Sequence, residues 1–229
     1  MEDLETVEDE TRYRFLDLHG VPETRSLDFH SPSGCSKGAG DQYVRDYARI
    51  FGLNSVVMRQ SCIYGRRQMG VEDQGWVAHF CISACLGRPI TIYGDGKQVR
   101  DLLWIDDLIG AYHAAAERRD VASGKIYNIG GGPSNTLSIW AEFGPLLSEL
   151  AGRPIERNTQ IGARGTSRCM SPRSRGRSRS SLGLRRSHRK RASAGCGSGW
   201  ERTSSSSVSE GCVERFLTDR PSAWARTSI

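Results

Sequence analysis

The side chains best suited to chemistry lie in one short stretch, Ser55–Gln68, which reads S-V-V-M-R-Q-S-C-I-Y-G-R-R-Q. A β-branched apolar run breaks there into polar and glycine residues, which predicts a buried parallel strand over Val56–Met58 followed by a loop. Ligands of open α/β sheets bind in the crevice beyond the carboxyl ends of such strands. The loop offers a guanidinium, a hydroxyl, a thiol and a phenol, from Arg59, Ser61, Cys62 and Tyr64. A strand followed by an ordinary polar turn is the alternative interpretation of the same pattern.

Two other groups have the residue types of a functional site without its spacing. His79, Cys81 and Cys85 could ligate a metal, but the two cysteines are four apart in an apolar helical run, where cysteine behaves as a small hydrophobic residue. We therefore predict no metal site. The run Gly130–Gly132 follows an expected strand, but the spacing G-x-x-G-x-x-G of a dinucleotide-binding turn occurs nowhere in the chain.

The elements that must position these residues follow from the apolar pattern. Apolar residues at three- and four-residue spacing predict helices, and short apolar runs between glycine or proline predict strands. We expect helices at 36–51, 74–86, 108–119 and from 136 or 138 to about 152, strands at 56–58 and 125–129, and a β-hairpin at 89–106. Ser36 and Asp106 are the expected caps of the first and third helices. Residues 1–30 show no steady period and are predicted to be irregular, and the whole order is that of an α/β body.

The composition divides the chain near Asn158. Residues 158–229 contain fifteen Lys and Arg against four Asp and Glu, whereas the preceding part contains seventeen against twenty-two. The run S-P-R-S-R-G-R-S-R-S-S has too few apolar residues to bury a core. We therefore predict a folded body at 1–157 and a largely disordered Arg/Ser-rich tail at 158–229. Two interpretations of this tail remain open: RNA binding through charge and arginine stacking, or an out-of-frame reading of GC-rich codons.

Composition also argues against several classes of protein. No run of about 18 apolar residues is present, as a membrane span would need, and the start M-E-D-L-E-T-V-E-D-E is acidic where a targeting peptide is basic. The seven cysteines are odd in number and form no C-x-x-C pair, so they do not indicate a disulfide framework. A cytoplasmic protein is the expectation.

Several motifs in a fixed order resemble those of one enzyme family. They are R-Q-S-C-I-Y-G-R-R-Q from Arg59, G-V-E-D-Q-G-W from Gly70, I-T-I-Y-G-D-G-K-Q-V-R-D from Ile90, W-I-D-D-L from Trp104 and Y-N-I-G-G-G-P-S-N-T-L-S from Tyr127. Over Leu4–Ile155 the chain resembles the extended short-chain dehydrogenase/reductase family, and within it the CDP-paratose 2-epimerase (CDP-tyvelose epimerase) branch of NAD-dependent nucleotide-sugar epimerases. This resemblance implies a Rossmann-type fold with a substrate-binding subdomain, NAD as cofactor, and epimerisation by hydride transfer.

The resemblance also implies roles for individual residues. The family's Tyr-x-x-x-Lys acid/base pair matches Ser33 and Lys37, in H-S-P-S-G-C-S-K. The residues expected to face the cofactor are Lys37, Arg59, Ser61 and Cys62. Those expected to contact the substrate are Tyr64, Gln68, Gln74 and Arg100, with Arg100 facing the diphosphate. Trp76 would help to shape the sugar pocket, and Asp107 would cap a helix.

Two departures from the family pattern lead us to expect a catalytically inactive, C-terminal part of an epimerase without the first strands of its sheet. A serine hydroxyl at position 33 is far less acidic than the family's phenol and shorter in reach. The Gly-rich turn that receives the NAD pyrophosphate has no counterpart, so NAD binding is expected to fail. The expected partners are a CDP-hexose-like nucleotide sugar and a second copy of the chain, with nucleic acid only through the tail. An Arg/Ser-tailed nucleic-acid-binding protein is the alternative function.

Overall fold

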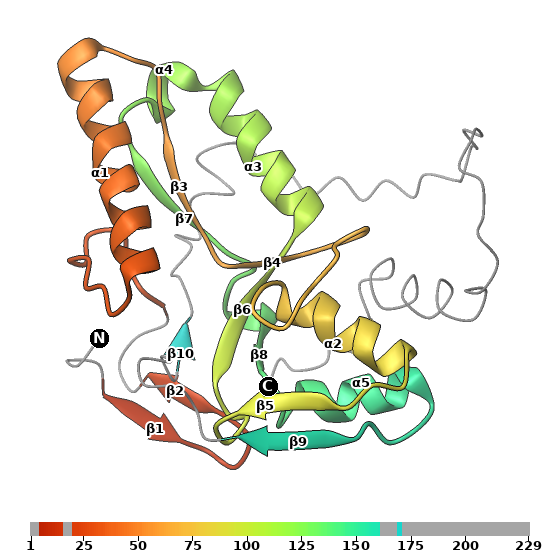
Figure 1. Ribbon diagram of the computed structural model, residues 1–229. Coiled ribbons are helices and arrows are strands. Elements are labelled where there is room, and N and C mark those ends of the chain that lie inside the picture. Colours follow the sequence, from red (N-terminus) through yellow and green to blue (C-terminus); the bar gives the residue numbers. More distant parts are fainter. Residues whose placement is uncertain (1–4, 16–19, 161–168, 171–229) are drawn as a thin grey trace, which may run out of the picture.

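The computed structural model describes residues 5–15, 20–160 and 169–170 (Figure 1). In chain order the elements are β1 Thr6–Glu8, β2 Tyr13–Phe15, α1 Pro32–Phe51, β3 Val57–Gln60, β4 Cys62–Tyr64, α2 Trp76–Cys85, β5 Ile90–Tyr93, β6 Val99–Trp104, α3 Ile105–Glu117, α4 Arg119–Ala122, β7 Ile126–Ile129, the 3₁₀ turn η1 Pro133–Asn135, β8 Thr136–Ser138, α5 Phe143–Ala151, β9 Arg157–Gln160 and β10 Cys169–Met170. The expected α/β class is confirmed. Of the predicted tail at 158–229, only residues 158–160 and 169–170 are among the described residues. The expected disorder and nucleic-acid binding of the tail concern residues that lie outside them.

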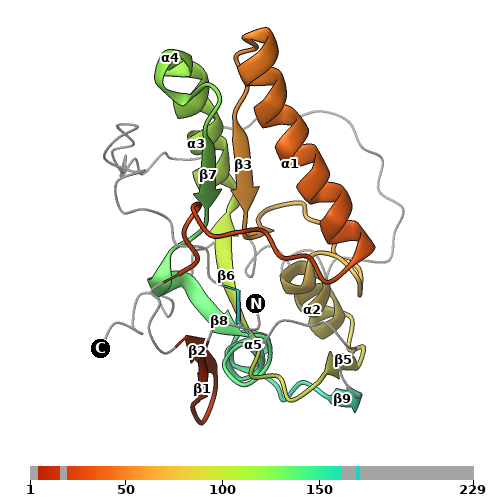
Figure 2. The same cartoon turned by 90° about the vertical axis from the view of Figure 1, so that its left-hand side faces the viewer.

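The strands β3 and β7 form a parallel pair in which Val57 lies opposite Ile126 and Gln60 opposite Ile129. Both views show α1 and α3 on opposite sides of this pair (Figures 1 and 2). Parallel strands are normally covered on both faces in this way. Because the two strands run in the same direction, their carboxyl ends meet at one edge, and the segment between β3 and β4 begins there.

A second sheet is built around β6. The strand β4 pairs with it in parallel, with Cys62 opposite Leu102, and β8 pairs with it antiparallel, with Val99 opposite Ser138. The short strand β10 pairs with its start in parallel. A separate parallel pair, β5 and β9, lies beside the helices α2 and α5 (Figure 1).

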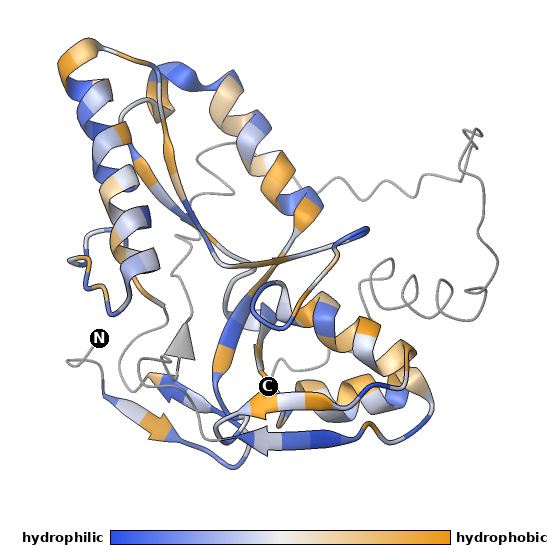
Figure 3. Cartoon of the chain, in the orientation of Figure 1, coloured by the Kyte–Doolittle hydropathy of each residue, from blue (hydrophilic) through white to orange (hydrophobic). Residues whose placement is uncertain are grey.

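The main core lies between β4, β5, β6 and the helices α2 and α5. Its buried members are Tyr64, Val77, Phe80, Cys81, Ala84, Ile90, Ile92, Leu102, Trp140, Phe143 and Leu147. On β5 the apolar residues Ile90 and Ile92 are 0% and 2% exposed, whereas all four residues of β9 are exposed. The same contrast is visible in the hydropathy of the two strands (Figure 3). The strand β5 therefore forms the boundary of the core, and β9 lies at the outer edge of the core beside it.

The predicted β-hairpin at 89–106 is wrong, because its two strands belong to different sheets: β5 pairs with β9, and β6 pairs with β4 and β8. Gly96 adopts a positive φ of 78° but Asp95 does not, so the two residues do not form the expected primed turn. The turn instead bonds to the segment after β8, where Trp140 N–H donates to the Gly96 carbonyl at 2.9 Å. Long-range pairing of the flanking strands thus overrides a local turn signal.

Three of the expected helices begin at other residues than predicted. The first helix begins at Pro32, capped by Ser31 rather than Ser36. The third begins at Ile105, so Asp106 and Asp107 lie in its first turn rather than capping it. The expected helix start at Thr136 or Ser138 is wrong, since these residues form β8 and the helix begins at Phe143.

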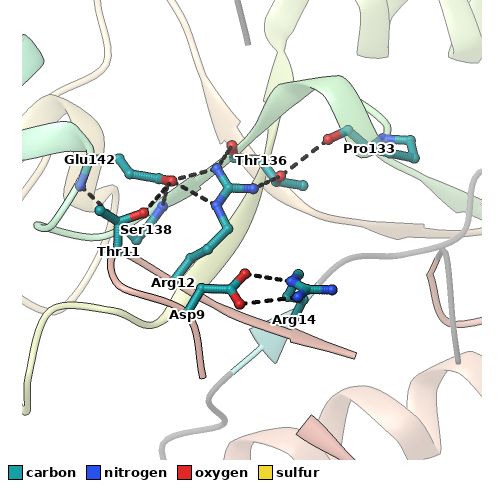
Figure 4. Close-up of polar contacts among 8 residues, drawn as sticks. All are labelled: Asp9, Thr11, Arg12, Arg14, Pro133, Thr136, Ser138 and Glu142. Carbon is teal, nitrogen blue, oxygen red and sulfur yellow. Dashed lines mark hydrogen bonds and ion pairs between the residues drawn. The ribbon is translucent and has the colours of Figure 1, made fainter. Parts of the chain in front are cut away.

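Residues 1–30, predicted to be irregular, contain the antiparallel hairpin β1–β2. Arg12 joins this hairpin to the second sheet (Figure 4). Its guanidinium donates to both carboxylate oxygens of Glu142, at 2.6 and 2.7 Å, and the Ser138 N–H donates to the same carboxylate at 2.8 Å. Lys97 adds a 2.8 Å ion pair with Glu8. A bidentate pair of this kind is among the stronger polar contacts in proteins.

We expect Glu142→Gln to lower the free energy of unfolding at pH 7 by about 1.5–3 kcal/mol, the usual cost of losing hydrogen bonds to a charged group. Burial opposes ionisation of Glu142, but the bonds from Arg12 and Ser138 outweigh it and hold the pKa of Glu142 below its usual value of 4.5. A lowered folded pKa stabilises the fold above the unfolded pKa and loses that contribution as the pH falls below about 4.5. Urea unfolding between pH 7 and 3 should show the difference between wild type and variant narrowing; a difference constant over this range would contradict the prediction.

Candidate functional site

A buried carboxylate lies where β3 and β7 end. Asp101, in β6, is 1% exposed and accepts three hydrogen bonds: from the Ser61 hydroxyl at 2.7 Å and from the Gly131 and Gly132 amides at 2.6 and 3.0 Å. Ser61 also donates its backbone N–H to the Ile129 carbonyl at 2.9 Å. Burial raises the pKa of Asp101, and these three donors oppose the rise. The residues after both parallel strands are thus held together by one side chain of the second sheet.

The opposite face of β4 and β6 carries a different set of side chains. Because side chains alternate along a strand and Cys62 lies opposite Leu102, Cys62, Tyr64 and Arg100 share the face away from Ser61 and Asp101. Tyr64 is 4% exposed and its ring packs edge-on against Trp104, with centroids 5.2 Å apart. Burial raises the pKa of the Cys62 thiol, while the nearby Trp76 indole and Arg100 guanidinium oppose the rise.

Two buried polar atoms lie close to this face. The Gln68 amide donates to the Ile63 carbonyl of β4 at 3.1 Å. The remaining oxygen of that amide, Oε1, has no hydrogen-bond partner within the described part of the chain, and the Trp76 indole nitrogen, Nε1, has none there but the Cys62 thiol, a weak acceptor. Buried polar atoms without partners are uncommon in folded proteins and call for an explanation, such as a bound molecule.

Arg100 is half-buried, and its guanidinium donates to the Val99 carbonyl at 2.9 Å and to Gln98 Oε1 at 3.4 Å. These two contacts are with its own strand and the residue before it. Gln74, by contrast, has an exposed side chain, and its backbone pairs with that of Val71. The structure therefore places Cys62, Tyr64 and Arg100 on one face of β4–β6 and bonds Gln68 to β4, whereas the Gln74 side chain lies at the surface.

The residues expected to face the cofactor lie on α1 and on the segment from β3 to the start of β4. Lys37 and Ser33 are exposed on the first turns of α1. Arg59 donates to both carboxylate oxygens of Asp41 on α1, at 2.6 and 3.2 Å, and its side chain is 23% exposed against 9% for Asp41. The Ser61 hydroxyl is engaged by Asp101, as described above. Arg59 and Ser61 are thus engaged by carboxylates of the protein, whereas Lys37 is exposed.

The sequence analysis assigns no role to Asp101, because the V-R-D motif points first to a diphosphate contact through Arg100. The alternation in V-R-D-L-L-W places Asp101 on the opposite face from Arg100, together with apolar Leu103. A carboxylate at such a position needs buried donors. The Gly130–Gly132 run supplies two of them, and its lack of NAD-turn spacing is consistent with this different use.

Comparison with known proteins identifies the family. Residues 17–130 match the NAD dependent epimerase/dehydratase family. The chain is 51% identical over 142 residues to CDP-paratose 2-epimerase of Salmonella typhi, covering 59% of this chain and 42% of that protein. UDP-glucose 4-epimerase of Thermotoga maritima, solved with UDP-glucose, is 28% identical with a TM-score of 0.62, covering 71% of this chain and 50% of the other. UDP-glucuronic acid 4-epimerase of Bacillus cereus, solved with UDP-glucuronic acid and NAD, shares the fold at 24% identity, with a TM-score of 0.65 over 86% of this chain and 55% of the other.

The chain thus spans 42% of the length of the Salmonella typhi protein and about half of the two solved structures. NAD is the cofactor of the family, and nucleotide sugars are the substrates of these relatives. Among the described helices none combines the length and the apolar character that a membrane crossing requires. Residues 17–130 of this chain thus belong to the NAD dependent epimerase/dehydratase family, whose model they match.

Proposed function

We propose that the body of this chain, residues 1–157, is the nucleotide-sugar-binding part of an epimerase of the CDP-paratose 2-epimerase type, and that it binds a CDP-hexose. One observation carries the proposal: Cys62 and the half-buried Arg100 share a face of β4–β6 beside two buried polar atoms. These are Gln68 Oε1, which has no partner in the described part of the chain, and Trp76 Nε1, which has only the Cys62 thiol there. A planar guanidinium suits a diphosphate, and an acceptor and a donor suit sugar hydroxyls. The 51% identity to CDP-paratose 2-epimerase favours a CDP-sugar over other nucleotide sugars.

We further propose that this 229-residue chain has no epimerase activity. The reaction needs an acid/base whose pKa lies near the working pH. Ser33 occupies the position that the family pattern gives to that group, and its exposed hydroxyl is far less acidic than a phenol. Binding of the sugar is therefore proposed without turnover.

Calorimetric titration with CDP-glucose tests the binding site. Wild type is expected to bind, and Arg100→Ala to bind about 10–100-fold more weakly, the usual effect of losing hydrogen bonds from a charged group. Arg88→Ala is the matched control, because Arg88 is an exposed arginine in the turn after α2, away from β4 and β6. Equal affinity of wild type and Arg100→Ala, or no binding by wild type, would reject the proposed site.

Incubation with NAD and CDP-paratose, followed by chromatography of the sugars, tests the second half of the proposal. We expect no CDP-tyvelose from this chain under conditions in which the Salmonella typhi epimerase forms it. Product formation by the purified chain would contradict the assignment of Ser33.

A further inference from the structure

The Asp101 carboxylate connects the β3–β7 pair to the sheet around β6 through hydrogen bonds. The β3–β7 pair and the sheet around β6 share no strand. Three of the contacts that connect them converge on the Asp101 carboxylate, one from Ser61, between β3 and β4, and two from Gly131 and Gly132, just after β7. Gly131 lies so close to β6 that an added Cβ would come within 1.9 Å of the Leu102 carbonyl oxygen.

The three donors at this position, one hydroxyl and two amides, require an acceptor group that carries no hydrogen of its own. A carboxylate offers acceptor sites on two oxygens and can take all three donors at once. The side-chain amide of asparagine has the same shape, but in either orientation its NH₂ group would face a glycine N–H, that of Gly131 or that of Gly132. A carboxylate therefore satisfies all three donors, and an amide of the same shape does not.

Resting on the proposed function, we propose that Asp101 is the positioning residue of the nucleotide-sugar site: it fixes the loops after β3 and β7 against β6 and thereby sets the direction of Arg100. Arg100 is its neighbour in the strand and projects from the opposite face. The two residues share one stretch of backbone, so the position of the Asp101 peptide sets where the Arg100 side chain leaves the strand. The three bonds to Asp101 add to the ladder with β4 and β8 in fixing that position, and through Ser61 they also hold Cys62, the next residue, opposite Leu102.

Two variants and two controls test this role. Asp101→Asn removes the acceptor at constant shape, and Ser61→Ala removes a single donor and leaves the carboxylate with both glycine amides, so it remains informative if Asp101→Asn does not fold. Ser61→Thr restores the hydroxyl. Ser138→Ala is the matched control, because Ser138 is 0% exposed and its hydroxyl accepts one bond from the Glu142 N–H at 2.8 Å on the other side of β6.

The first measurement is amide hydrogen exchange, which needs no ligand. Asp101→Asn should speed exchange at Gly131, Gly132 and residues 61–64 by about 10–100-fold, and Ser61→Ala should speed that of residues 61–64 by about 2–10-fold, while α5 exchanges as in wild type. Ser61→Thr and Ser138→Ala should leave these loops unchanged. Unchanged loop exchange in both Asp101→Asn and Ser61→Ala would overturn the role of Asp101.

The second measurement is calorimetric titration with CDP-glucose. Affinity should fall about tenfold in Asp101→Asn and a few-fold in Ser61→Ala, recover in Ser61→Thr, and be unaffected in Ser138→Ala. Loosened loops with unchanged affinity would overturn the link from Asp101 to Arg100. If wild type itself fails to bind CDP-glucose, the proposed function is wrong and the link to Arg100 falls with it. The exchange data separately decide whether Asp101 holds the two loops.

Discussion

Gly131→Ala is expected to lower the free energy of unfolding by about 3 kcal/mol, the upper end of the usual cost of overpacking. The new methyl group would lie 1.9 Å from the Leu102 carbonyl oxygen and 2.9 Å from the Asn135 Cβ. Leu102 is 2% exposed in the middle of β6, so its backbone cannot retreat without disturbing β4 and β8. The glycine loop must move instead, which breaks its two amide bonds to Asp101. Denaturant unfolding followed by circular dichroism measures the loss.

Gly40→Ala is the matched control for that prediction. Gly40 lies inside α1, and an added Cβ would meet nothing within 4 Å. Alanine in a helix interior is more favourable than glycine by about 0.5–1 kcal/mol, so this variant should be slightly more stable than wild type. If both variants change stability by similar small amounts, the loop and β6 are not in the close contact described here.

Local patterns predicted the elements whose signals lie within a single segment. The helix expected at 74–86 is present as Trp76–Cys85, and the strand expected at 125–129 as Ile126–Ile129. The α1 stripe also had the correct period, but Tyr43 and Tyr47 are 68% and 50% exposed, so a helical repeat did not imply burial. Periodicity identifies the apolar side of an element without saying what covers it.

Predictions failed where the decisive partner is remote in sequence. Asp95-Gly96 is a strong hairpin signal, yet β5 pairs with β9, which begins more than sixty residues after β5, at Arg157. Asp101 depends on donors about 30 residues away in the glycine loop. The motif resemblance did relate Tyr64 and Arg100, whose strands β4 and β6 are neighbours in the structure, because those motifs record tertiary contacts that local propensity does not contain.

Phe143→Ala should cost about 3–5 kcal/mol of unfolding free energy, the range observed for truncating a buried phenylalanine. Phe143 is 2% exposed at the start of α5, and its ring packs against Trp76, with centroids 5.1 Å apart, and against Phe80, at 6.3 Å. Phe51→Ala is the matched control, since Phe51 is 64% exposed at the end of α1 and its loss should change stability by less than about 0.5 kcal/mol.

The Phe143 substitution also tests how the core supports the site. The Trp76 indole lies between the Phe143 ring and the face that carries Cys62, so a cavity at position 143 gives the indole room to turn and to withdraw its Nε1. We therefore expect the affinity for CDP-glucose to fall in Phe143→Ala under conditions in which the variant is still folded. A variant that loses stability but binds CDP-glucose as tightly as wild type would exclude the Trp76 indole from the binding site while leaving the core assignment intact.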